Sequence, residues 1–567
     1  MRVKLPKELR GLSFPRITTI EFNDFDVDLL LPSLFFRILA EGSGRARRTN
    51  DATTIDKYVH ALATHPELEG FDSQGGERIL HKFVRTSLAN IGRTGAQRNR
   101  TEQILAVAPY SVLSHKTGLP SESSRQRNVD TFLYEVLRER SGSETGLRRF
   151  ITQVFGKGVV VDRLPQLGGR YDGMTQMDTL TRLSLAFLDG FQPTAAGRSL
   201  GRIRAESCPS LVAALGGDLQ HYLYTFYERM PPQALTYHLL GLINFELFVY
   251  TLKLVHAVNQ LVRAPDDLPP AMRPALQLSP PDLYVDFTGE PGSLSQQMAT
   301  AGVRRDLDAY GQFFTSLLTL RQLDRYAEIL GRNHRLASAL ETLLAARSSM
   351  APDYLRLLLQ TADNPVIAAS VEAQAMSEEE AIRQLNRKVA QEEDASEEDS
   401  LAWLDALLPP HLDAVQRVVA LLAESQKRAL SSLGKWYQGS GGLSKPQGIL
   451  AGTPTGRRAW RYQPSNDLLA VWVQLASIQL RADDDGQDQG PRPIPLREFL
   501  AFLHDRFGIL IDRPPEPFSG AEHVAAARDN LRAMLRRLRQ MGVFRDLSDD
   551  FTVQALQPPY AAVEANP

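Results

Sequence analysis

The residues His238–Val258, with the sequence HLLGLINFELFVYTLKLVHAV, are the most apolar stretch of this chain. The stretch is long enough to cross a bilayer, but it contains Asn244, Glu246 and Lys253. A carboxylate and an ammonium group near the middle of a membrane span cost roughly 2.5–3.5 kcal/mol each on insertion scales. The stretch therefore predicts a buried helix in the core of a mainly α-helical, water-soluble protein that does not contact a membrane.

The overall composition is that of an ordinary globular protein. Of the 567 residues, 43% are hydrophobic and 23% are charged. The chain has 64 Lys and Arg against 66 Asp and Glu, so binding to nucleic acid requires a local basic patch. The single cysteine, Cys208, excludes an intramolecular disulfide and a zinc site built on several thiolates, and we expect it to be a buried structural thiol. The basic N-terminus is not followed by the apolar run of a secretory signal, which favours a cytoplasmic location.

Proline and glycine clusters suggest the domain boundaries. Six prolines between positions 264 and 281 prevent a helix or a central strand from running through that segment. Short β-branched runs such as Val159–Val161 and Leu283–Phe287 predict a minor β content between the helices. We predict an N-terminal, mostly helical domain (1–263), a Pro-rich linker (264–281), a helical domain (282–437), a flexible Gly-rich connector (438–459) and a C-terminal domain (460–560).

Several common motifs for catalysis and cofactor binding do not occur in this sequence. The Gly-rich stretch Gly439–Lys445 lacks the Gly-x4-Gly-Lys-Ser/Thr spacing that brings amides and a lysine onto a phosphate chain. The sequence contains neither a His-Glu-x-x-His zinc motif nor a Gly-x-Ser-x-Gly nucleophile elbow. We therefore predict no catalytic residue, no cofactor and no metal ligand, although an enzyme whose active site is built from distant residues stays an alternative.

The C-terminal domain has the most ordered pattern. Ser465 precedes a helical pattern over residues 466–475, and a second helix is expected at 494–503, with Pro495 in its first turn. A third helix is expected over 521–541, ending at Gly542. Residues 543–554 then read as a two-stranded hairpin. Three helices followed by such a hairpin are the order of a winged helix, a fold whose last helix lies in the DNA major groove.

Arginines on the third helix are the candidate binding residues. Arg528, Arg532 and Arg536 recur at intervals of four residues, on the side away from the Leu/Met face. Guanidinium groups aligned in this way can contact phosphates or guanine edges. The predicted DNA-binding residues are Arg528, Arg532, Arg536, Arg537, Arg539 and Arg545.

Four short strings carry a family resemblance. Trp460–Tyr462, Asn466–Leu469, Arg506–Asp512 and Leu547–Phe551 together resemble proteins encoded in bacterial antiphage defence islands, particularly those of methylation-associated defence systems. The likeness covers about the last hundred residues. It implies a multi-gene defence module with other defence-system proteins as partners.

These observations lead to one main expectation and two alternatives. We expect a non-enzymatic DNA-binding or adaptor subunit of an antiphage defence complex, which contacts duplex DNA through its C-terminal winged helix. The first alternative is a protein-interaction scaffold that does not bind DNA. The second is a metal-dependent nuclease with a dispersed site.

Overall fold

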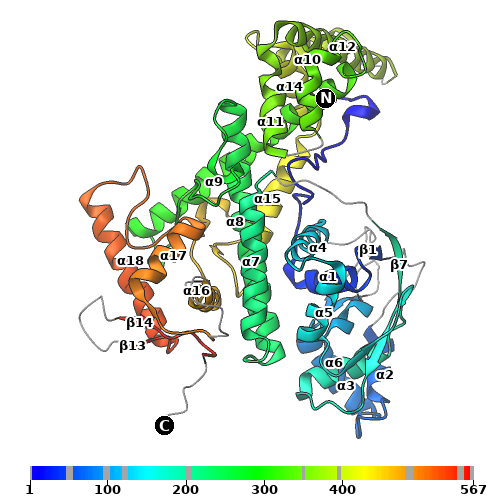
Figure 1. Ribbon diagram of the computed structural model, residues 1–567, viewed down its shortest axis with the longest axis vertical. Coiled ribbons are helices and arrows are strands. Elements are labelled where there is room, and N and C mark those ends of the chain that lie inside the picture. Colours follow the sequence, from blue (N-terminus) through cyan, green and yellow to red (C-terminus); the bar gives the residue numbers. More distant parts are fainter. Residues whose placement is uncertain are drawn as a thin grey trace.

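The computed structural model is mainly helical, as the sequence predicts. Its described residues contain eighteen α-helices and only short strands, in two- and three-stranded sheets (Figure 1). One hydrophobic cluster runs from Val3 to Leu556 and includes residues of every predicted domain, so the division into separate domains stays a prediction. The structure describes residues 3–45, 55–92, 102–117, 126–199, 207–347, 351–392, 397–479, 490–545 and 554–561.

Two neighbouring helices, α7 (Pro209–Phe226) and α8 (Pro232–Arg263), form the centre of the molecule (Figure 1). By length and composition α8 could span a membrane, but 94% of its most apolar window is buried inside the protein. The prediction of a buried core helix is therefore confirmed. Cys208, at the start of α7, is also buried as expected, and burial raises the pKa of its thiol to about 12.

The N-terminal half packs on one side of these central helices. Its inner helices share the main hydrophobic cluster, and the Phe132 ring stacks on Tyr250 of α8 at 5.1 Å. Its outer helices have a small hydrophobic core of their own, in which Tyr58 stacks on Phe191 at 3.9 Å. The inner helices are α1 (Leu30–Leu39), α4 (Val129–Arg140) and α5 (Glu144–Phe155), and the outer ones are α2 (Ile55–Ala63), α3 (Gln74–Phe83) and α6 (Thr179–Asp189).

The strands of this half form three small sheets. In one, the order is β1-β7-β5; in the others β2 pairs with β3 and β4 with β6, and all of these pairs are antiparallel. The predicted strand Val159–Val161 is present as β4, but Val160 is 47% exposed, because β4 has only one partner strand and one covered face. The strands are β1 (Ser43–Arg45), β2 (Ala89–Gly92), β3 (Gln103–Val107), β4 (Val159–Val161), β5 (Gln166–Leu167), β6 (Gly169–Tyr171) and β7 (Thr194–Ser199).

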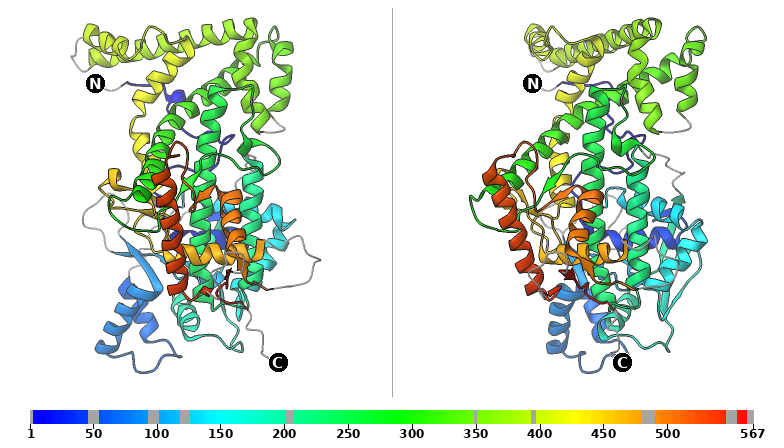
Figure 2. Two further views of the ribbon diagram at one scale, coloured as in Figure 1. Left: turned by 90° about the vertical axis from the view of Figure 1, so that its left-hand side faces the viewer. Right: turned by 60° about the vertical axis from the view of Figure 1, so that its left-hand side comes forward.

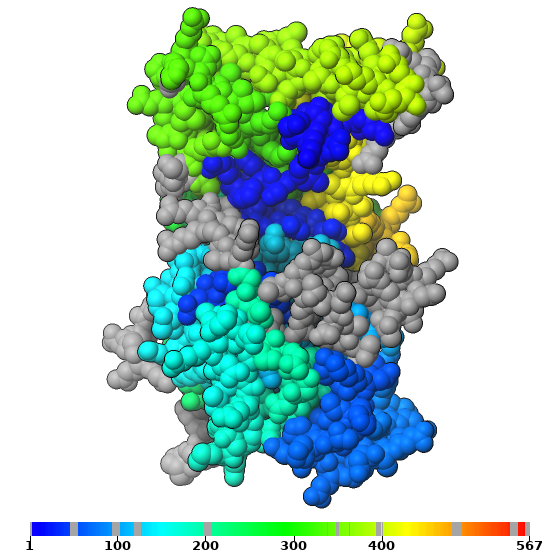
Figure 3. Space-filling model, turned by 90° about the vertical axis from the view of Figure 1, so that its right-hand side faces the viewer, coloured from blue at the N-terminus to red at the C-terminus, as the bar shows by residue number. Residues whose placement is uncertain are grey.

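A long helix, α9 (Leu294–Leu330), leads from the centre to a cap of further helices at one end of the molecule (Figure 2). The first residues of the chain cross this region, where the Ser425 hydroxyl donates to the Val3 carbonyl at 2.7 Å (Figure 3). The helical character predicted for residues 282–437 is confirmed in the described part of that segment. The cap helices are α10 (Ala337–Ala346), α11 (Ala351–Leu359), α12 (Pro365–Glu392), α13 (Glu397–Ala406) and α14 (Ala414–Ser425), followed by α15 (Arg428–Ser440).

The two segments expected to be linkers are packed. In the Pro-rich segment, Ala271 and Met272 are buried, next to α7 and α8. In the Gly-rich segment, the Asn244 side chain of α8 donates to the Ser440 carbonyl at 2.7 Å. Gly442 has a φ of +66° and lies so close to Gly448 that a side chain would clash, so the glycines serve a tight buried turn rather than a flexible connector.

The C-terminal residues form three helices and a three-stranded sheet, which lie beside the two central helices α7 and α8. The sheet has the antiparallel order β11-β14-β13, so the strand before the second helix pairs with the last strand. Two further pairs connect this region to earlier residues: β12 runs parallel to β8, and β9 pairs with β10. The elements are β8 (Leu283–Tyr284), β9 (Leu450–Ala451), β10 (Arg461–Tyr462), α16 (Asn466–Gln479), β11 (Ile494–Pro495), α17 (Leu496–Phe507), β12 (Ile509–Leu510), α18 (Ala521–Gln540), β13 (Phe544–Arg545) and β14 (Ala555–Leu556).

Candidate functional site

Helix α18, which carries the predicted DNA-binding arginines, forms as the sequence pattern indicates. Its buried face includes Ala527, Met534 and Leu538. The helix ends at Gln540 and is followed by Gly542, whose φ is +71°, and the Val543 amide donates to the Leu538 carbonyl at 3.0 Å. This hydrogen bond and the left-handed glycine are the usual C-terminal cap of a helix. The opposite face of α18 is left to solvent.

Three of the predicted arginines lie on that open face. Arg528, Arg532 and Arg536 are exposed. Arg532 pairs with Asp529 at 2.7 Å, but both side chains are more than 60% exposed, at 74% and 65%. An ion pair this exposed contributes at most about 1 kcal/mol, so it does not prevent Arg532 from contacting a ligand. We define these three residues as the arginine face of α18.

The other predicted arginines have different surroundings. Arg537 donates to the carbonyls of Phe287 at 2.9 Å and Pro464 at 3.2 Å, so it connects α18 to the body of the protein. The guanidinium of Arg539 lies over the Phe544 ring, 5.3 Å from its centre. The side chain of Arg545 lies outside the described residues, and so do residues 546–553 of the predicted hairpin 543–554.

Asn530 fixes the position of α18 and was not singled out by the sequence. Its side chain is fully buried, accepts from the Phe287 amide at 2.6 Å and donates to the carbonyls of Val285 at 2.8 Å and Ile511 at 3.1 Å. One amide therefore connects α18 to two separate backbone segments. Its sequence signal is a polar residue on an otherwise apolar helix face.

A buried ionic network joins the C-terminal helices to the central pair. Arg506 of α17 donates through Nε to the Asp218 carboxylate of α7 at 3.0 Å. Glu246 and Lys253 of α8 complete the network, and Asp218, Glu246 and Lys253 are at most 4% exposed. Burial and then the neighbouring Asp218 raise the pKa of Glu246 well above its usual value. The sequence marked Glu246 and Lys253 as polar residues of an apolar stretch, and only the fold shows their partners.

Between about pH 8 and pH 10, the free energy of unfolding of the unmodified protein is expected to rise with pH because of Lys253. Replacing Lys253 with methionine is expected to remove this rise. Burial, then Arg506, lowers the pKa of Lys253 to about 8 in the folded protein, against about 10.4 in an unfolded chain. Between these values the unfolded chain binds the proton and the folded protein does not, so stability increases with pH, by at most about 3 kcal/mol. Urea unfolding from pH 7.5 to 9.5 measures the rise. An identical pH dependence of both proteins would contradict this assignment.

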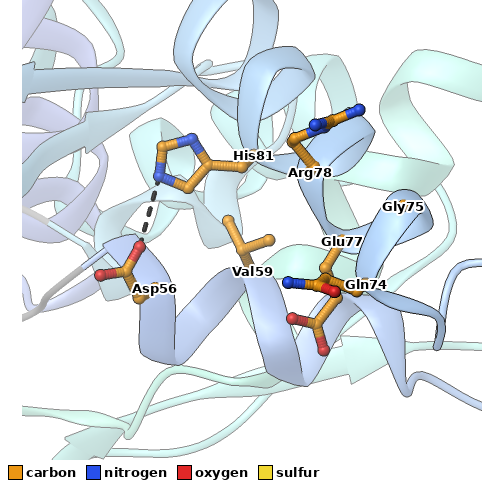
Figure 4. A pocket seen from close by; sticks show the side chains of 7 residues that line it. All are labelled: Asp56, Val59, Gln74, Gly75, Glu77, Arg78 and His81. Carbon is orange, nitrogen blue, oxygen red and sulfur yellow. Dashed lines mark ion pairs between the residues drawn. The ribbon is translucent and has the colours of Figure 1, made fainter.

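A cavity of about 680 Å³ lies between α2 and α3 (Figure 4). At its edge His81 Nε2 lies 3.3 Å from an Asp56 carboxylate oxygen, and Glu77 contacts His60 Nδ1 at 2.6 Å. Each pair is a histidine with one carboxylate near the surface. Among the described residues, no three His, Cys, Asp or Glu side chains are grouped so that they could hold a metal ion.

Comparison with protein families identifies the chain over nearly its whole length. The family model of the methylation-associated defense system protein MAD7 matches residues 7–560. The chain belongs to this family. The match confirms the resemblance seen in the last hundred residues and extends it to the central helices and the cap.

Membership in the MAD7 family makes this chain a component of a methylation-associated defence system. Other proteins of that system are therefore its expected partners. Comparisons with curated proteins and with solved structures gave no match.

Proposed function

We propose that this MAD7-family chain is a duplex-DNA-binding subunit of its defence system, acting in the cytoplasm, and that its C-terminal domain (460–560) is a winged helix. The connectivity supports the proposed fold. The helices α16, α17 and α18 follow one another, β11 lies between the first two, and β13 and β14 follow the third. The sheet order β11-β14-β13 also supports the proposal, because it is the strand order of a winged helix.

The arginine face of α18 carries the proposed DNA contact. Residues 528 and 536 are eight positions apart, which corresponds to about 12 Å along a helix. The major groove of B-DNA is also about 12 Å wide, so three guanidiniums on this face can reach phosphates and base edges of one groove. Helix α18 lies at the left side of the molecule in Figure 1, and it faces the viewer in front of the central helices in the left view of Figure 2.

A mobility-shift titration at several salt concentrations tests this function. Replacing both Arg532 and Arg536 with alanine is expected to weaken duplex binding by about tenfold or more and to reduce the log–log salt slope by about two, because two phosphate contacts are lost. The matched control replaces Arg387 and Lys388, two exposed cations of α12 in the cap, with alanine. This control removes the same charge from a distant surface and is expected to leave the slope unchanged.

Unchanged binding by the Arg532/Arg536 variant would overturn the proposed role of α18. Capture of defence-system partners without any DNA affinity would favour the protein-interaction scaffold. Divalent-metal-dependent cleavage of plasmid DNA, abolished by one carboxylate substitution, would favour the nuclease.

A further inference from the structure

A second candidate binding site lies in a cleft between α8 and α9. The cleft has a volume of about 470 Å³, within the range of roughly 300–1,000 Å³ typical of small-molecule sites. The side chains used below that line it are His256, Gln260, Arg263, Arg305, Asp308 and Gln312. None of them belongs to the arginine face of α18.

The buried carboxylate of Asp306 fixes the position of the Arg305 guanidinium. Asp306 is fully buried and accepts from Arg305 Nε at 2.8 Å and Nη2 at 3.0 Å. Nη2 also donates to the Asp282 carbonyl at 3.0 Å, whereas Nη1 makes no hydrogen bond within the described part of the chain. The Arg305 side chain is 39% exposed. The guanidinium is therefore already oriented before a ligand binds, and the N–H groups of Nη1 are available to donate to it.

His256 is oriented by the same carboxylate. Its Nε2 lies 2.9 Å from Asp306 Oδ1, and the Tyr462 hydroxyl donates to Oδ2 at 2.6 Å. Tyr437 contacts the Tyr462 hydroxyl at 2.6 Å, so a chain of buried polar groups runs from the core to the imidazole. The His256 side chain is 19% exposed and is one of the side chains that line the cleft. Nδ1 makes no hydrogen bond to the described residues.

Arg263 forms the other cationic part of the cleft. It lies at the last position of α8, and its Nη2 donates to the Gln312 side chain of α9. The lining thus contains two guanidiniums and one imidazole against a single carboxylate, that of Asp308, which is exposed. Gln260 adds a neutral amide. This set supplies several N–H donors and is suited to a tetrahedral oxyanion.

We propose that this cleft binds the phosphate group of a small molecule between Arg263 and Arg305, with His256 as a third contact. Arginine suits this role because its planar fork contacts two phosphate oxygens at once. The buried carboxylate behind Arg305 and His256 keeps both groups in position before the ligand arrives. Two sources share this chemistry, inorganic phosphate and a phosphate ester such as a nucleoside monophosphate.

Isothermal titration calorimetry of the full chain with inorganic phosphate and with adenosine monophosphate tests the proposal. Tighter binding of the monophosphate assigns the cleft to phosphate esters, and equal or tighter binding of phosphate assigns it to the free ion. Arg263→Gln and Arg305→Lys are each expected to weaken binding by about tenfold, because each loses a charge-assisted hydrogen bond. Arg305→Lys keeps a cation beside Asp306, and Arg263 lies at a helix end, so both variants are expected to fold.

Two further variants make the test specific to the cleft. Asp308→Asn removes the one carboxylate of the lining and is expected to tighten binding by about two- to fivefold, an effect that general loss of structure does not produce. Arg304→Gln changes the exposed neighbour of Arg305 on α9, which is not among the lining residues, and is expected to leave binding unchanged. The absence of measurable heat for both ligands up to about 10 mM overturns the proposal, and so does an equal effect of Arg263→Gln and Arg304→Gln.

Discussion

Replacing Arg506 with methionine is expected to lower the free energy of unfolding by about 3–5 kcal/mol. The substitution leaves the Asp218 carboxylate, which is 2% exposed, without the guanidinium that now donates to it. A buried charge that has lost its partner costs far more than the pair itself contributes. Glu246 lies in the same network, but it supplies no positive charge that could replace the guanidinium. Urea unfolding followed by tryptophan fluorescence measures the loss, since Trp472 is buried in the same core.

A double substitution separates charge burial from lost packing. Adding Asp218→Asn to Arg506→Met removes the uncompensated charge, so we expect it to recover a large part of the lost stability. The control Arg497→Met, at an exposed position of the same helix α17, is expected to change stability by less than about 0.5 kcal/mol. Equal losses from the single and the double variant would show that charge burial is not the cause.

Replacing Asn530 with leucine is expected to lower the free energy of unfolding by about 4 kcal/mol. Leucine has the same branched side-chain skeleton as asparagine, with methyl groups in place of the amide oxygen and nitrogen, so it leaves the Phe287 amide and the carbonyls of Val285 and Ile511 without this partner. Each unsatisfied buried backbone group costs about 1–3 kcal/mol. The same substitution is expected to weaken DNA binding while the exposed arginines stay unchanged, because α18 loses its fixed position on the body.

The control for this prediction is Gln540→Leu, which adds the same apolar side chain at an exposed position of α18. We expect it to leave both stability and DNA binding nearly unchanged. A loss of stability at Asn530 no larger than that at Gln540 would contradict the role given to the buried amide. Urea unfolding and a mobility shift with one duplex measure the two effects on the same preparations.

The local pattern of the sequence was sufficient for most helices. The apolar face of α18, with Met534 and Leu538, and its end at Gly542 follow from helical spacing and from the left-handed conformation that glycine adopts easily. The core position of α8 follows from its long apolar stretch together with the polar residues Asn244, Glu246 and Lys253 within it. These features depend on residues that are neighbours in the chain, so a short window of sequence contains the information.

Contacts with a distant partner could not be predicted from the local pattern. Arg537 continues the basic run of α18, yet its guanidinium bonds to carbonyls of Phe287 and Pro464. The Gly-rich stretch has the composition of a flexible connector, but Asn244 of α8 holds it in a buried turn. In each case the partner lies far away in the sequence, and no local pattern indicates which distant group will meet the side chain.

The sequence by itself determined a helical protein, the solvent-facing arginines of one late helix, and a defence-system family that the match to residues 7–560 confirms. Only the tertiary structure decided which charged groups meet inside it, such as Arg506 with Asp218 and Arg305 with Asp306. The physical reason is the range of the interactions. Helical periodicity and caps act within a few residues, whereas a buried charge is stable only beside a partner that the folding of the whole chain brings to it.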